Sequence, residues 1–243
     1  MTTTLLQHIK DVADEVGVGR PSAVIGSSDR AIQRLLTMSN REGRDLMRSV
    51  EWTILQRLHT FTTTASTAEY ALPADYDRLI RDTEWDRAKY EPMIGALSPQ
   101  RWQAIKSGLI GSGVVGRRYR IYRSDSTATR TFRIDPTPTV ADETLAFEYI
   151  SSYWCASTDG TAAAAWAADT DYTLHNPDLH TLGTIVRYKR SLGLDYASEA
   201  DEYASLSATL SGQDRPSPTL SMAPSPRVRL IGPENLPDSG LGS

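Results

Sequence analysis

Acidic side chains gather in one short stretch of the chain, and their spacing could hold a metal ion. Asp75 and Asp77 flank a tyrosine, so in a β-strand both carboxylates would point to the same face. Hard divalent cations such as Mg²⁺ or Mn²⁺ prefer carboxylate oxygens as ligands. One hypothesis is therefore a metal-dependent enzyme that uses Asp75 and Asp77.

The surrounding residues favour a simpler interpretation. The acidic positions continue through Asp82, Glu84 and Asp86. Three arginines are interleaved with them: Arg78, Arg81 and Arg87. Mixed charge of this kind is typical of a solvated strand edge, where carboxylates stay in water or pair with nearby arginines. We therefore expect no metal, no cofactor and no catalytic residue, and the enzyme hypothesis is kept as an alternative.

Other patterns that could support catalysis are incomplete. His175 and His180 are five residues apart, whereas two metal ligands on one helix need a spacing of three or four. The glycine-rich segment 108–116 lacks the Gly-Lys-Ser or Gly-Lys-Thr ending of a phosphate-binding loop. Cys155 is the one cysteine of the chain, and we expect a buried, inert thiol.

Arginines and tyrosines alternate in "RRYRIYR", residues 117–123. In a hairpin, Arg118, Arg120 and Tyr122 would share one face, and Arg123 would lie on the other. Arginines beside tyrosines suit contact with backbone phosphates plus stacking on bases. Two interpretations stay open: a DNA-binding module formed by the hairpin 117–133, or a strand face that is solvated or lies between subunits.

Composition restricts the class of protein. The 243 residues can bury a real core, and 40% hydrophobic with 23% charged residues is ordinary for a soluble globular chain. The net charge of −4 disfavours a dedicated nucleic-acid binder. We find neither a secretion signal nor a run of about 18 apolar residues, so we expect a soluble protein without a membrane partner.

The periodicity of apolar residues predicts an α+β fold. Helical spacing occupies both ends of the chain, while strand-like runs and one short helix after Ser98 fill the middle. Gly43 lowers the propensity of the second helix by about 1 kcal/mol, which weakens the prediction of an unbroken helix. The expected units are a helical bundle of about four helices (1–57 and 172–211), an inserted antiparallel β-rich unit with a short helix (58–171), and an extended C-terminal arm (212–243).

The arm differs in composition from the rest. It holds six of the 13 prolines and no periodic apolar face, so we expect it to be disordered when alone in solution. Its best anchors for a partner, by charge and apolar area, are Arg227, Val228, Arg229, Leu230 and Ile231.

Taken together, the motifs and their order resemble a known family. The succession "EYALPADYDRLIRDTEWDR", "LSPQRWQAIKSGL", "FRIDPTP" followed by "ETLAFEYISSYW", "AWAADTDYTLHNPDL" and "GTIVRYKRSLGLDYASEADEY" is similar to the head-to-tail adaptor proteins of tailed bacteriophages. These include the tail tubular protein A and head-completion adaptor families. The likeness covers about residues 3 to 211.

The resemblance implies a structural virion protein at the head-tail junction, made in the cytoplasm of the bacterial host. Copies would form a ring, commonly of twelve, that docks beneath the portal and extends the DNA channel towards the tail. The implied partners are the portal protein, tail or nozzle proteins, further copies of the chain, and double-stranded DNA that passes without sequence specificity. The two C-terminal helices would be core and neighbour-facing.

The resemblance also assigns roles to residues. The segment 215–237 would dock on the portal, through Arg215, Arg227, Val228, Arg229, Leu230 and Ile231. The DNA channel or a contact between subunits would use Arg118, Arg120, Tyr122 and Arg123. The alternatives to the adaptor are a virion-associated enzyme with Asp75 and Asp77, and the DNA-binding hairpin.

Overall fold

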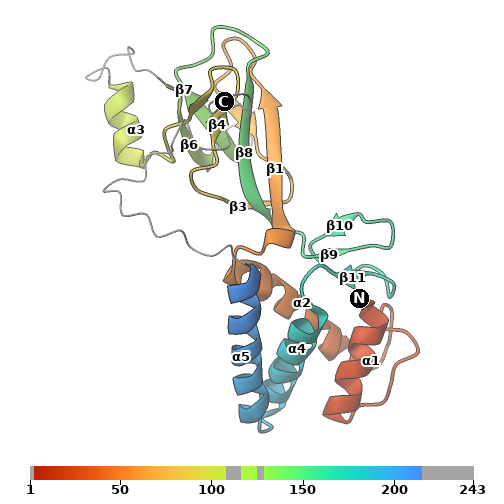
Figure 1. The fold of residues 1–243 in the computed structure, drawn as a ribbon. Helices are drawn as coiled ribbons and strands as arrows, with labels where there is room; N and C mark the ends of the chain where they lie inside the picture. The colour runs from red at the N-terminus through yellow and green to blue at the C-terminus, as the bar shows by residue number, and fades with distance from the viewer. Residues whose placement is uncertain (1–2, 108–115, 125–128, 215–243) are drawn as a thin grey trace, which may run out of the picture.

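The computed structural model describes residues 3–107, 116–124 and 129–214. It has two lobes, one helical and one formed by β-strands, as Figure 1 shows. Both ends of the described chain contribute to the helical lobe, and the middle forms the β lobe. The predicted α+β class is confirmed.

Four helices form the helical lobe: α1 (Leu5–Val16), α2 (Arg30–Ser49), α4 (Pro177–Leu192) and α5 (Ala197–Asp214). Their ends follow local rules. Asn176 caps α4 by accepting hydrogen bonds from the amides of Asp178 and Leu179, and Pro177 takes the first helical position. Gly17 and Gly193 end α1 and α4 in the left-handed conformation, with φ of 73° and 71°.

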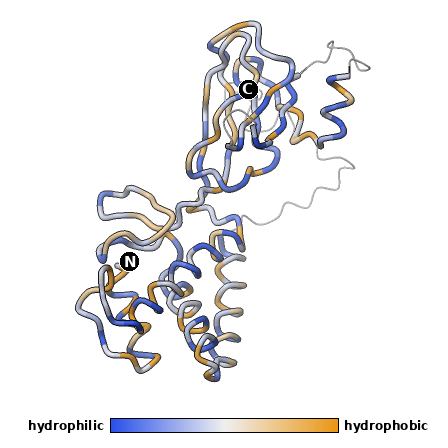
Figure 2. Tube along the Cα trace, turned by 180° about the vertical axis from the view of Figure 1, so that it is seen from behind, coloured by the Kyte–Doolittle hydropathy of each residue, from blue (hydrophilic) through white to orange (hydrophobic). Residues whose placement is uncertain are grey.

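The core of the helical lobe comes from the apolar faces of these helices. Leu5, Ile9, Leu35 and Leu46 are completely buried. Helix α4 packs against α1, α2 and α5, whereas α5 has no fully buried residue of its own. Figure 2 shows hydrophobic and hydrophilic residues alternating along these helices, as amphipathic helices require.

Helix α2 is continuous from Arg30 to Ser49, so Gly43 does not interrupt it despite its low helix propensity. The reason is packing: the ring of Trp154 lies where a side chain at position 43 would lie. Trp154, Cys155 and Trp166 all belong to the helical core, although they lie within 58–171. A short three-stranded sheet carries this segment: β9 (Cys155–Ala156), β10 (Ala162–Ala163) and β11 (Tyr172–Thr173).

The β lobe contains two antiparallel sheets. The larger consists of β1 (Gln56–Thr62), β8 (Thr144–Ser151), β3 (Tyr76–Leu79), β4 (Trp85–Asp86) and β5 (Glu91–Pro92). The smaller consists of β2 (Glu69–Ala71), β7 (Arg130–Asp135) and β6 (Arg118–Arg123). Their core is aromatic: Phe132 stacks on Tyr119 within its own sheet and on Phe147 of the other, with ring centroids 4.8 and 5.1 Å apart.

The short helix α3 (Pro99–Lys106) belongs to the β lobe and begins as expected, with Ser98 accepting from the Arg101 amide and Pro99 in the first turn. A single-turn 3₁₀ helix, η1 (Thr53–Leu55), leads from α2 into β1. Among the helices of the described residues, none is both long enough and apolar enough to span a bilayer.

The two lobes are joined by specific contacts as well as by the chain. Arg78 of β3 donates to the carbonyls of Met47 and Val50 at the end of α2, at 3.3 and 2.9 Å. Ile150 of β8 is completely buried in the helical core. Strands β1 and β8 therefore reach from the β lobe to the helical lobe, as Figure 1 shows.

Candidate functional site

Asp75 and Asp77, the candidate metal ligands, have separate partners. Asp75 accepts hydrogen bonds from the hydroxyls of Tyr149 and Ser151, at 2.9 and 2.6 Å. Asp77 pairs with Arg78 at 3.0 Å. Within the described ranges, no cluster of three or more histidine, cysteine, aspartate or glutamate side chains could hold a metal ion. The metal-dependent alternative therefore gains no support from the geometry.

The expectation of a solvated edge is wrong for the end of the acidic stretch. Asp86 is 0% exposed and pairs with the Arg117 guanidinium at 2.9 Å, while its other oxygen accepts from the amides of Ala88 and Lys89. Arg117 also pairs with Glu143. A buried pair of this kind is strongly destabilised when one partner is removed, so Asp86 and Arg117 act as structural residues.

Glu84 is also buried, and burial raises the pKa of its carboxyl group. Its Oε1 has no hydrogen-bond partner among the described residues. The local sequence around Glu84 and Asp86 carries no information about distant residues that cover them, such as Arg117.

The outer face of β6 has the alternation that the sequence predicted, and most of its charge is paired. Arg118 is buried and pairs with Asp135 at 3.1 Å, and Lys106 of α3 pairs with the same carboxylate. The Tyr122 hydroxyl donates to Glu69 at 2.5 Å. Arg120 lies over the ring of Tyr122, 5.6 Å from its centroid.

Helix α3 covers part of this face. Trp102 is buried beneath two cations, Lys106 and Arg133, at 5.3 and 5.7 Å from the ring centroid. Arg133 also faces Glu69 at 3.5 Å. Two arginines of this sheet, Arg118 and Arg133, are therefore engaged with carboxylates of the chain, which reduces the positive charge left for a phosphate backbone. Arg123 ends the strand at an exposed position.

Two histidines that are distant in the sequence, His8 and His180, contact each other in the helical core. The rings of His8 and His180 are 4.8 Å apart, and the Ser39 hydroxyl lies 3.0 and 3.1 Å from their Nε2 atoms. Burial lowers the pKa of His8 to about 4 and holds that of His180 well below its ordinary value. Both rings are neutral near pH 7, and the Trp166 indole completes the network by donating to Ser39.

A buried carboxylate joins three helices. Glu42 of α2 is 1% exposed, pairs with Arg187 of α4 and accepts from the Tyr203 hydroxyl of α5 at 2.7 Å. Gly183 makes the approach possible, because a β-carbon there would lie 2.2 Å from a Glu42 oxygen. The sequence offered one signal for this cluster, a glutamate on the apolar face of α2.

The candidate portal-docking residues Arg215, Arg227, Val228, Arg229, Leu230 and Ile231 lie outside the described residues. The described chain ends at Asp214, whose carboxylate accepts from the amide and hydroxyl of Thr53, at 2.8 and 2.6 Å. The last described residue of α5 is thus attached to the junction of the two lobes.

Two comparisons with known proteins bear on identity. The model of the SU10 adaptor protein family matches residues 3–228. No curated protein matches the chain. The family match includes every described helix and strand and continues 14 residues past Asp214, to position 228. The chain therefore belongs to the SU10 adaptor protein family.

Proposed function

We propose that this chain is a structural virion protein, the head-to-tail adaptor of a tailed bacteriophage. Its copies form a ring, twelve by the resemblance, which docks beneath the portal, extends the DNA channel and receives the tail. The observation that carries the proposal is the match to the SU10 adaptor protein family across both lobes. The finer likeness to tail tubular protein A and head-completion adaptors is part of the same proposal.

The chemistry of the buried polar groups supports a scaffold rather than an enzyme. Glu42, Asp86 and Arg117 are buried in ion pairs that connect separate elements. Asp75 is bound by two hydroxyl groups. Such contacts fix the arrangement of helices and sheets, which is what a ring-forming component needs.

A ring requires two different surfaces on each copy, one that fits the other. Helix α5 is a candidate for one of them, because it packs on the bundle through one side only. Strand β1 is a second candidate, since it lies at the edge of the larger sheet and carries Leu58, which is 57% exposed. The outer face of β6, with Arg120, Tyr122 and Arg123, is a third.

The arm is proposed to make the portal contact. A proline-rich segment without its own core can order on a partner and cover a large surface, at a cost in conformational entropy. Its proposed anchors are those named from the sequence: Arg215, Arg227, Val228, Arg229, Leu230 and Ile231.

Mixing the purified chain with the portal protein of the same phage tests the proposal. Electron microscopy should show a ring of this chain attached to the portal. A matched variant that ends at Asp214 keeps the contact with Thr53, so it should fold normally and lose most of its attachment. The proposal is overturned if the full chain forms no ring on the portal. Full attachment of the shortened variant would remove the role of the arm.

A further inference from the structure

Five arginines lie along one face of α2: Arg30, Arg34, Arg41, Arg44 and Arg48. At 100° per residue they fall within an arc of about 80°. The residues that α2 buries, such as Ile32, Leu35 and Leu46, are on the opposite side. All five are exposed except Arg34, which is half-buried. We call this set the arginine row.

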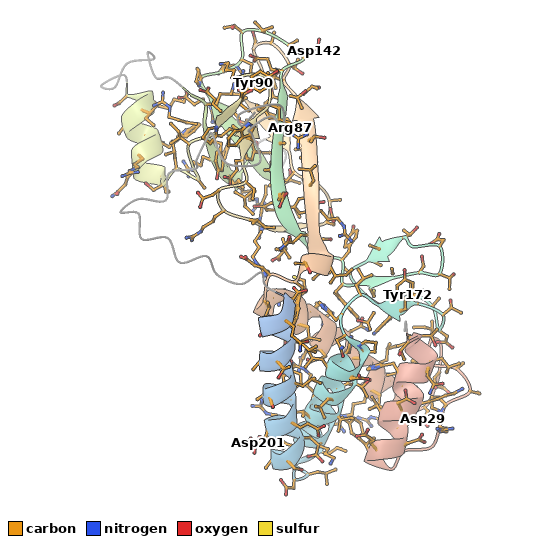
Figure 3. All side chains as sticks on the ribbon, viewed as in Figure 1. Asp29, Arg87, Tyr90, Asp142, Tyr172 and Asp201 are labelled. Atoms are coloured by element: carbon orange, nitrogen blue, oxygen red, sulfur yellow. The ribbon has the colours of Figure 1, made fainter. Side chains whose placement is uncertain are left out.

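The arginine row is not neutralised by ion pairs within the described part of the chain. None of its members forms an ion pair with a described carboxylate. Arg34 donates to the carbonyl of Ser191 instead. The two acidic residues within α2, Glu42 and Asp45, both pair with Arg187. Asp29, labelled in Figure 3, caps the first turn of α2 through the Ala31 amide.

Five like charges on one helix face repel one another, whereas a solvated face that mixes the two signs avoids this repulsion. Like charges three or four residues apart destabilise a helix by about 0.2–0.5 kcal/mol per pair, and surfaces without partners usually mix the two signs. In the β lobe, Arg117, Arg118 and Arg133 each face a carboxylate. The arginine row therefore places five like charges on one helix face, and an anionic partner would relieve their repulsion.

The shape of the surface continues the row at both ends. A hollow of about 580 Å³ is lined by Arg30, Arg34 and Tyr188. A second, of about 550 Å³, is lined by Arg48 and Arg78 and also by two acidic residues, Glu51 and Asp214. Within the described residues, the first hollow has no acidic residue in its lining and offers guanidinium groups to an anion, which guanidinium can bind through two parallel hydrogen bonds. The second hollow is mixed in charge.

We propose that the arginine row binds the phosphate backbone of double-stranded DNA. The row is about 27 Å long at 1.5 Å per residue. Double-stranded DNA carries one negative charge per about 1.7 Å of its axis, so phosphates face the row in any register and no sequence is required. The inference rests on the proposed adaptor function, because it assigns the surface that meets the DNA there.

A second copy of this chain is the less suitable partner. Helix α5 exposes two neighbouring acids, Asp201 and Glu202. On α1, exposed Asp14 is already paired with Arg20 at 2.5 Å, which leaves Glu15 beside it. Neither helix provides an acidic row of matching length within the described residues. Charge complementarity therefore favours the polyphosphate.

Fluorescence anisotropy of a short mixed-sequence DNA duplex with the full chain tests the proposal, over about 50 to 200 mM salt. The test variant carries Arg41→Gln, Arg44→Gln and Arg48→Gln, since glutamine keeps helix propensity. The matched control removes three exposed arginines of the β lobe: Arg81→Gln, Arg87→Gln and Arg101→Gln. Far-UV circular dichroism checks that both variants fold.

For the wild type we expect binding that weakens steeply with salt. Each lost phosphate contact lowers the slope of log K against log salt by about 0.9, so the test variant should lose about 2.7 and the control much less. Equal slopes for wild type and test variant, or equal loss in the control, overturn the proposal. The proposal is also overturned if the test variant binds DNA normally but no longer assembles into a ring, because the partner of the arginine row is then a protein.

The portal-ring experiment keeps the two proposals distinguishable. A ring that joins the portal with unchanged DNA binding in the test variant refutes the arginine row alone. Salt-dependent DNA binding through the row, without any ring on the portal, refutes the adaptor function and leaves the row as a DNA-binding surface.

Discussion

The ring of Trp154 lies 2.4 Å from the point where a β-carbon of Gly43 would stand. Trp154 follows β8 and is completely buried, and Gly43 is near the middle of α2. Packing therefore requires glycine at this position. The helix loses some intrinsic propensity, but the indole can lie directly against its backbone.

Gly43→Ala should lower the free energy of unfolding by about 1–3 kcal/mol, because overpacking outweighs the gain of about 1 kcal/mol in helix propensity. Chemical denaturation measures the change. Gly212→Ala is the matched control, since α5 leaves open space around that position. It should be neutral or slightly stabilising, and an equally mild Gly43→Ala would contradict the packing argument.

The contact of Glu42 with Tyr203 predicts how α5 is held. Tyr203→Phe removes a hydroxyl that donates to a buried carboxylate, and should cost about 1.5–3 kcal/mol. Asp45→Asn is the comparison, because Asp45 pairs with the same Arg187 but its side chain is 45% exposed. It should change the free energy of unfolding by less than about 1 kcal/mol. Urea denaturation of both variants checks the difference.

The buried histidines predict a loss of stability in acid. Their pKa is lowered in the folded state, to about 4 for His8, so the unfolded chain binds more protons below pH 6.5. The free energy of unfolding should therefore fall as pH drops from 6.5 to about 4, by up to about 1.4 kcal/mol per pH unit for each such histidine. Denaturation at several pH values measures the slope.

His8→Gln isolates one contribution to that slope. The variant should be less stable at pH 7, because it loses the packing of the ring, but its stability should fall less steeply with acid than that of the wild type. Parallel slopes for the two proteins would show that the acid sensitivity comes from other groups.

Metal binding directly tests the alternative of a metal-dependent enzyme that uses Asp75 and Asp77. Titration calorimetry with Mn²⁺ should give small and equal heats for the wild type and for Asp77→Ala, because Asp75 and Asp77 are bound by different protein groups. A binding heat that disappears in Asp77→Ala would restore the metal-dependent hypothesis.

The features that sequence predicted well are those set by neighbours along the chain. The short helix that follows Ser98 is an example, because its cap depends on residues within one helical turn. By contrast, the pair of His8 and His180 is invisible at the level of spacing, because 172 positions separate its members. Apolar periodicity likewise gives no sign that Trp154 joins the helical core and not the β lobe.

The acidic stretch and the arginine row show a second limit. Charges that stand close together or beside aromatic residues are conspicuous in a sequence, whereas the arginines of α2 repeat at helical spacing and share a face only when the helix is formed. Which charges are used internally depends on partners far along the chain, such as Arg117 for Asp86. That information exists in the fold and not in the local sequence.

The link between Asp214 and Thr53 determines where the arm leaves the body. In the proposed ring, every copy would start its arm at the same height and radius, so the portal would meet an evenly spaced set of tethers. Linked contacts gain from effective concentration, and an arm that binds feebly alone can hold firmly as one of many. Attachment would then survive the loss of a few arms, yet a single unassembled copy would dissociate quickly.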